Sequence, residues 1–129
     1  MENPNILVDT SIIIEHLRKT QRKNTQLHEL ASKYRLYTSS VVEFELRAGA
    51  ADDQKQQQVD VILSAFVVIL PFSSEVSQEA AYIYRVLKRN NLLIEIRDIF
   101  IAATAITHNM RLATTNRKHF ERIDKLQLV

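Results

Sequence analysis

The sequence contains no cysteine and a single glycine, and its apolar runs are short. Without cysteine, the chain has no disulfide, no zinc–thiolate site and no cysteine nucleophile. Because Gly49 is the one glycine, glycine-rich phosphate-binding loops are excluded as well. No apolar run approaches the roughly 20 residues that a membrane crossing requires. The start of the chain, with acidic Glu2, also lacks the basic and apolar regions of a signal peptide. We therefore expect a cytoplasmic protein that does not associate with membranes.

The remaining composition is that of an ordinary globular protein. The 129 residues are 46% hydrophobic and 25% charged. We expect one domain over residues 1–129 that folds without a disulfide or a structural metal. The formal net charge of +2 is too small to establish a nucleic-acid partner, but basic residues gather at 18–23 and from Arg85 onward. Such groups around an acidic centre would hold a phosphate backbone, although solvated surface residues explain each of them equally well.

Apolar, β-branched runs alternate with helical patterns along the chain. Strands are predicted at 6–8, 35–39, 67–72, 112–115 and 126–129. Helices are predicted at 11–19, 25–34 and 41–50, from Asp52 or Asp53 through Phe66, from Ser73 or Ser74 through Leu87, and at 99–106. The last of these is apolar almost all round and should be buried. This alternation is typical of an α/β fold in which helices cover both faces of a parallel sheet.

Four polar residues that are far apart in the sequence fall at the same edge of this predicted sheet. They are Asp9, Glu45, Asp98 and Asn116. Asp9 and Asn116 each follow a strand directly. Glu45 lies one turn into the helix after the second strand, and Asp98 starts the buried helix. Because the working site of such a sheet lies outside the carboxyl ends of its strands, we expect the four side chains to meet.

Each of these residues also has a purely structural interpretation. Asp9 and Asp98 are good helix N-caps or partners of a helix dipole, and Asn116 is a common turn residue. Glu45 differs, since it lies between apolar neighbours, where a carboxylate without a partner is costly. In the same helix, residues 40–43 fit a capping box, with Ser40 as the N-cap. The coincidence of all four residues at one sheet edge favours a common site.

Converging carboxylates require a positive partner. Two carboxylates about 4 Å apart repel by about 4 kcal/mol at an effective dielectric constant near 20. Three would therefore bind protons or move apart unless a divalent cation neutralised them. Oxygen ligands favour Mg²⁺ or Mn²⁺, and the sequence has no histidine pair at the spacing of zinc ligands. We predict that Asp9, Glu45 and Asp98 bind Mg²⁺ or Mn²⁺ for attack of water on a phosphodiester, and that Asn116 completes the catalytic set.

Four sequence blocks, in this order, resemble the PIN-domain family and specifically its VapC-type toxin ribonucleases. The blocks are ILVDTSIIIEHL, TSSVVEFELRAGA, RDIFIAATAI and LATTNRKHFERI. By motif position, the acidic metal-site residues of the family fall on Asp9, Glu45 and Asp98, and its fourth position falls on Asn116. The resemblance implies that these residues form the catalytic centre.

The resemblance also implies a three-layer α/β/α sandwich around a five-stranded parallel sheet. It implies endonucleolytic cleavage of RNA with Mg²⁺ or Mn²⁺, a homodimer, and neutralisation by a VapB-type antitoxin through which the complex would bind operator DNA. Thr10 and Ser11 match the part of the motif that helps to order the first aspartate. Two features depart from the family pattern. His119 replaces a further acidic residue, and the segment before Asp98 lacks a glycine or proline, which leaves Glu95 without an assigned role.

A second interpretation stays open at this point, namely a catalytically idle PIN module that acts in antitoxin-mediated DNA-binding regulation. Asn116 and His119 are compatible with it, because both reduce the negative charge of the site. A receiver-like domain with Asp9 as phosphoacceptor is disfavoured, because Leu7 and Val8 precede Asp9 in place of further acidic residues.

Overall fold

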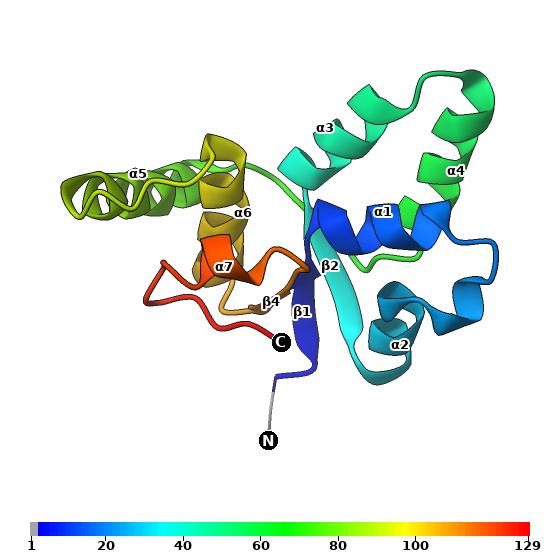
Figure 1. The fold of residues 1–129 in the computed structure, drawn as a ribbon, viewed down its shortest axis with the longest axis horizontal. Coiled ribbons are helices and arrows are strands. Elements are labelled where there is room, and N and C mark those ends of the chain that lie inside the picture. The colour runs from blue at the N-terminus through cyan, green and yellow to red at the C-terminus, as the bar shows by residue number, and fades with distance from the viewer. Residues whose placement is uncertain (1–2) are drawn as a thin grey trace.

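The computed structural model describes residues 3–129 and arranges them around a parallel sheet (Figure 1). The strands are β1 (Asn5–Val8), β2 (Arg35–Ser39), β3 (Ile69–Leu70) and β4 (Arg111–Ala113), in the spatial order β3-β2-β1-β4. Leu7 of β1 pairs with Tyr37 of β2 on one side and with Leu112 of β4 on the other. β1 is therefore central, and its three apolar residues are fully buried. Glu2, which was considered above, lies outside the described residues.

Helices cover both faces of the sheet, which confirms the predicted α/β sandwich (Figure 1). They are α1 (Thr10–Arg18), the 3₁₀ turn η1 (Arg22–Asn24), α2 (Gln26–Lys33), α3 (Ser40–Gly49), α4 (Asp53–Leu63), α5 (Ser74–Arg89), α6 (Ile96–Thr107) and α7 (Arg117–Phe120). In Figure 1, α1 and α2 lie on one side of the sheet, and α6 and α7 lie on the other. Long helix α5 packs along α6 and extends outward from the sheet.

The sheet has four strands rather than the predicted five. The expected last strand, 126–129, contributes only an isolated parallel bridge between Leu128 and Leu112. Leu126 belongs to a turn, since its N–H donates to Ile123 O at 3.2 Å, and the contact with β4 begins at Gln127, whose carbonyl accepts from the Leu112 N–H at 2.9 Å. The Val129 N–H still donates to Leu112 O at 2.9 Å, so the segment lies against β4 without forming a strand.

Burial follows the apolar pattern of the sequence. Helix α6 is the most enclosed helix of the sandwich, and Ile99, Ile101, Ala102, Ala103 and Ala105 are all fully buried. The predicted strand 67–72 is shorter than expected, since it retains only β3 before Pro71. Within residues 3–129, no helix combines the length and the apolar character that a membrane crossing requires.

Candidate active site

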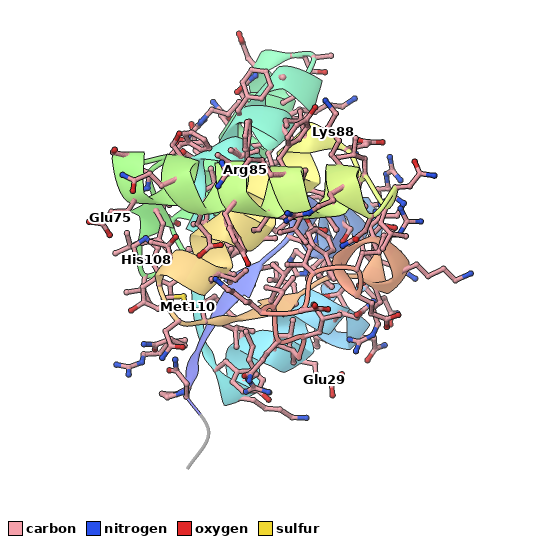
Figure 2. All side chains as sticks on the ribbon, turned by 90° about the vertical axis from the view of Figure 1, so that its left-hand side faces the viewer. Glu29, Glu75, Arg85, Lys88, His108 and Met110 are labelled. Atoms are coloured by element: carbon pink, nitrogen blue, oxygen red, sulfur yellow. The ribbon has the colours of Figure 1, made fainter. Side chains whose placement is uncertain are left out.

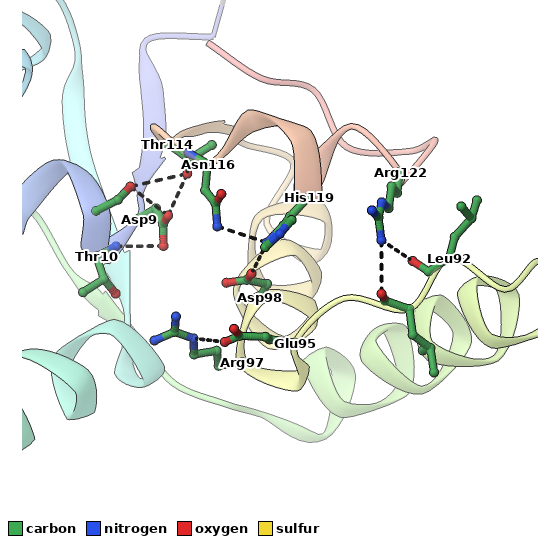
Figure 3. A network of polar contacts seen from close by, with 12 residues as sticks. Asp9, Thr10, Leu92, Glu95, Arg97, Asp98, Thr114, Asn116, His119 and Arg122 are labelled. Atoms are coloured by element: carbon green, nitrogen blue, oxygen red, sulfur yellow. Dashed lines mark hydrogen bonds and ion pairs between the residues drawn. The ribbon is translucent and has the colours of Figure 1, made fainter.

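Asp9 lies directly after β1 and is 5% exposed. Its backbone N–H donates to Ala113 O at 2.9 Å, which fixes it beside the end of β4. The carboxylate accepts three hydrogen bonds: Oδ1 from the Thr10 N–H at 2.8 Å, and Oδ2 from Ser11 Oγ at 3.0 Å and Thr114 Oγ1 at 2.7 Å (Figure 3). Asp9 is therefore the N-cap of α1, as its structural interpretation proposed. The same bonds hold it as an oriented, buried carboxylate.

Glu45 reaches this place from the first turns of α3, and its side chain is 13% exposed. Thr10 Oγ1 donates to its Oε1 at 2.8 Å, and Arg97 Nη1 donates to its Oε2. Arg97 also donates from Nε to Glu95 Oε2 at 2.8 Å (Figure 3). The carboxylate that the sequence left without a partner thus has two partners from its own chain, one of them a cation.

Asp98 lies in the first turn of α6 and is 4% exposed. Burial raises the pKa of its carboxyl group, the hydrogen bond from His119 opposes this shift, and the negative charge of Asp9 adds to it. His119 Nδ1 lies 3.2 Å from Asp98 Oδ2 and 3.0 Å from Asn116 Nδ2 (Figure 3). Because the Asn116 amide nitrogen only donates, Nδ1 accepts from it when unprotonated and donates to Asp98 when protonated, so the tautomer of the ring decides which of the two hydrogen bonds forms.

Asn116 connects the two halves of the site. Its backbone N–H donates to Thr114 Oγ1 at 2.9 Å, and the same hydroxyl donates to Asp9. Its side-chain amide contacts His119, which contacts Asp98. The structure therefore connects the four predicted residues through one continuous series of polar contacts. We call this series the acidic network; it comprises Arg97, Glu45, Thr10, Asp9, Thr114, Asn116, His119 and Asp98.

The donor chemistry of the acidic network fits a hard divalent cation. It offers carboxylate, hydroxyl and amide oxygens in a largely buried place, where Asp9 raises the pKa of Asp98 by its charge. Within residues 3–129, no three carboxylate or imidazole side chains are gathered as a ready metal-binding group. In this state, the two carboxylate oxygens of Glu45 are not free to bind an ion, since they accept hydrogen bonds from Thr10 and Arg97.

Two local predictions are wrong. The N-cap of α3 is Ser39, whose hydroxyl accepts from the Val42 N–H at 3.2 Å. Ser40 Oγ instead accepts from the Phe72 N–H at 3.1 Å, and Glu43 pairs with Arg47 rather than reaching back to the helix start.

Asp98 is not an N-cap either, but it lies in the first turn of α6, as its interpretation as a partner of the helix dipole requires. Helix α6 begins earlier than predicted, with Glu95 at the cap position and without a capping side chain. Asp98 is therefore the third residue of the helix, and its carboxylate contacts His119.

Sequence reasoning missed three members of the acidic network, namely Arg97, Thr114 and, as a contact residue, His119. Arg97 directly precedes Asp98, and Thr114 lies two residues before Asn116. Their position beside predicted site residues was the feature of the sequence that could have identified them as members of the site. The expectation that Thr10 and Ser11 order Asp9 agrees with the contacts, except that the Thr10 hydroxyl is directed to Glu45.

A parallel sheet between helices, with Asp9, Thr114 and Asn116 connected by hydrogen bonds at the carboxyl ends of β1 and β4, defines the class of the protein as an α/β domain with a polar, acidic site. The sequence matches the PIN domain family over residues 6–126, and the chain belongs to that family.

Its relatives are VapC ribonucleases. Ribonuclease VapC1 of Methanocaldococcus jannaschii is 32% identical over 127 residues, which cover 98% of this chain and 87% of the relative. Ribonuclease VapC of Rickettsia bellii is 32% identical over 131 residues, covering 96% and 94%. Among solved structures, VapBC2 from Rickettsia felis bound to a promoter DNA fragment contains a chain with a TM-score of 0.84 and 29% identity, covering 97% of both chains.

Proposed function

We propose that this chain is a metal-dependent endoribonuclease and the toxin of a VapBC-type toxin–antitoxin pair. The observation that carries the proposal is the convergence of Asp9, Glu45, Asp98 and Asn116 in one hydrogen-bonded network. The curated relatives support the reaction class, since they are named ribonucleases.

In this proposal Asp9, Glu45 and Asp98 hold Mg²⁺ or Mn²⁺. Bound there, the ion would acidify a coordinated water and stabilise charge on the phosphate oxygens. The residues around the carboxylates orient them. Ser11 and Thr114 fix one oxygen of Asp9, and His119 contacts Asp98. Asn116 places a neutral amide group near the carboxylates, and because it is uncharged it does not add to the repulsion between them.

The substrate would approach over the start of α1. A hollow of about 530 Å³ along α1 has two hydroxyl groups, two basic groups, one carboxylate and one apolar side chain in its lining, namely Ser11, Thr115, Arg18, Lys19, Glu15 and Ile14. Basic side chains in such a place attract a phosphate backbone. Arg85 and Lys88, in contrast, lie on the outer face of α5 (Figure 2). We therefore assign the RNA contact to the α1 group and not to α5.

We also propose a VapB-type antitoxin as partner, with operator DNA bound through it, because the Rickettsia felis neighbour is a VapBC complex on promoter DNA. A groove of about 350 Å³ between α1, α3 and α4 supports this proposal. Its lining combines apolar Ile14, Leu17 and Val59 with Glu45. A partner segment in this groove would reach the acidic network. Tyr82 and Tyr84, which are 45% and 36% exposed on α5, are candidates for the surface of a homodimer.

The direct experiment is cleavage of RNA by the purified protein in Mg²⁺ or Mn²⁺. Asp9→Asn and Asp98→Asn should abolish cleavage, as should excess EDTA, whereas the surface control Asp124→Asn should cleave like the wild type. Expression without a partner should slow growth, and the Asp9→Asn form should be tolerated. Cleavage that persists in both site variants would falsify the assignment.

The catalytically idle module remains the second candidate, and one observation favours it. The acidic network is satisfied by its own residues, with Arg97 as the counter-charge of Glu45. Calorimetry with Mn²⁺ separates the two functions. The nuclease binds the ion and loses that binding in Asp9→Asn, whereas the idle module gives no heat at millimolar ion.

A further inference from the structure

We propose that Arg97 is a built-in competitor of the divalent cation at Glu45, and that Glu95 is the residue onto which Arg97 is released. This inference rests on the proposed function, because it concerns how the chain's own residues set the affinity of the acidic network for the ion. It assigns roles to two residues, Arg97 and Glu95, that the catalytic set does not include.

The contacts of Arg97 are divided between two different environments. Nη1 binds Oε2 of Glu45, whose side chain is 13% exposed, and Nε binds Oε2 of Glu95 at 2.8 Å, whose side chain is 61% exposed. Arg97 itself is half exposed, at 52%. The guanidinium therefore neutralises the largely buried carboxylate of Glu45 through Nη1, and it binds the solvent-exposed carboxylate of Glu95 through Nε.

The two oxygens of Glu45 are both engaged in this state. Oε1 accepts from Thr10, and Oε2 accepts from Arg97. A carboxylate that binds a divalent ion must give up or share one of these contacts. The hydroxyl of Thr10 is neutral and compatible with a nearby cation, whereas the guanidinium is itself positive and is repelled by it. Of the two partners, Arg97 is thus the one that the ion must displace.

The place of Arg97 in the chain strengthens the competition. It directly precedes Asp98, so its charge stands next to two of the three proposed ligand carboxylates. Glu95 lies two residues before Arg97, at the cap position of α6. When Arg97 leaves Glu45, the Nε contact to Glu95 still gives the guanidinium a carboxylate partner, at a position that is exposed to solvent. Glu95 therefore lowers the cost of release.

This arrangement predicts effects of opposite sign at neighbouring residues. Arg97→Gln removes the competitor and should tighten Mn²⁺ binding by about three- to tenfold, the range expected for one charge at a partly exposed site. Glu95→Gln removes the release position and should weaken Mn²⁺ binding by about two- to fivefold on the same grounds. If Glu95 acts through Arg97, Glu95→Gln should have little further effect in the Arg97→Gln background.

The matched control is Arg47→Gln. Arg47 lies on the same helix as Glu45 and also bridges two carboxylates, those of Glu43 and Asp60. Its partners are outside the acidic network, so its loss should leave Mn²⁺ binding unchanged. A second readout is thermal unfolding in EDTA, in which Arg97→Gln should be less stable than the wild type because Glu45 keeps only Thr10.

The experiment measures the dissociation constant of Mn²⁺ from the electron paramagnetic resonance signal of the free ion, for the wild type and the four variants. Tighter binding in Arg97→Gln, with weaker binding in Glu95→Gln alone, supports the competition. Equal affinity of Arg97→Gln and the wild type overturns this inference and leaves the proposed function standing. Binding in Arg97→Gln but not in the wild type supports the competition and revises the proposed function. No binding in either protein overturns both.

Discussion

The hydroxyl of Thr10 donates to Glu45 at 2.8 Å, across 35 positions of sequence. The backbone N–H of the same residue donates to Asp9. The first residue of α1 therefore sets the positions of two carboxylates that the sequence places on different elements. A metal site depends on such outer contacts, because they fix the direction of the ligand oxygens.

Replacing Thr10 tests this contact. Thr10→Val keeps the shape of the side chain and removes the hydroxyl, so Glu45 loses its neutral partner and is held by Arg97 alone. We expect Mn²⁺ affinity or RNA cleavage to fall by about 10- to 100-fold, the usual cost of losing such a contact. Thr10→Ser keeps the donor and should stay close to the wild type; a loss as large as that of Thr10→Val would assign the effect to packing.

The raised pKa of Asp98 gives a prediction about stability and pH. Because the pKa is higher in the folded than in the unfolded state, the folded state favours the protonated carboxyl. The stability that this preference contributes is complete below the unfolded pKa, and it is lost as the pH rises through the folded value. In EDTA at neutral pH, Asp98→Asn should therefore raise the melting temperature.

The size of that gain should depend on pH. Melting curves of the wild type and Asp98→Asn should approach each other as the pH is lowered, since protonation removes the buried charge that the variant lacks. Mn²⁺ should stabilise the wild type and leave the variant nearly unchanged. A gain that is the same at pH 4 and pH 7 would contradict burial of the ionised carboxylate as its cause.

His119 stands where the family pattern has an acidic residue. Its replacement by Asp should lower the stability of the metal-free protein and raise its affinity for Mn²⁺. His119→Asp adds a carboxylate beside Asp98, so the metal-free protein should unfold at a lower temperature through like-charge repulsion. The same charge should tighten Mn²⁺ binding. His28→Asp, which makes the same exchange at an exposed position of α2, should do neither.

Phe120 anchors the segment that carries Asn116 and His119. It is fully buried at the end of α7, a helix of only four residues. Phe120→Ala should cost about 3–5 kcal/mol in the free energy of unfolding, as for other buried phenylalanines. Phe120→Leu fills more of the space and should cost less. Denaturant unfolding measures both, and equal losses would mean that the cavity is not what destabilises the protein.

Much of the site could be predicted from the sequence because strand ends are visible there. Asp9 directly follows an apolar run, Asn116 lies three residues after the end of β4, and parallel strands place such residues at one edge. Glu45 and Asp98 were placed by the helices that follow a strand or lead into one. The prediction that these side chains lie near Asp9 and Asn116 used the fold class alone. The hydrogen bond between Thr10 and Glu45 and the contact between His119 and Asp98 agree with that prediction.

The remainder depended on contacts between distant elements, which no local pattern reveals. The pairing of Arg97 with Glu45 spans 52 positions, and the sequence alone does not distinguish this arginine from a solvated one. The choice between Ser39 and Ser40 as the cap of α3 was settled by Phe72, which takes the Ser40 hydroxyl. The predicted strand at 126–129 likewise begins in a turn at Leu126, which the apolar pattern does not reveal.

The central claim is that Asp9, Glu45 and Asp98 together form a divalent cation site. Anomalous diffraction from crystals soaked in Mn²⁺ tests it most directly, because it locates the ion independently of activity. We predict a peak about 2 Å from carboxylate oxygens of Asp9 and Asp98, with the Glu45 carboxylate turned toward it and Arg97 released from Glu45 but still bound to Glu95. A well-soaked crystal in which Mn²⁺ occupies only other positions, while Arg97 stays on Glu45, would contradict the account.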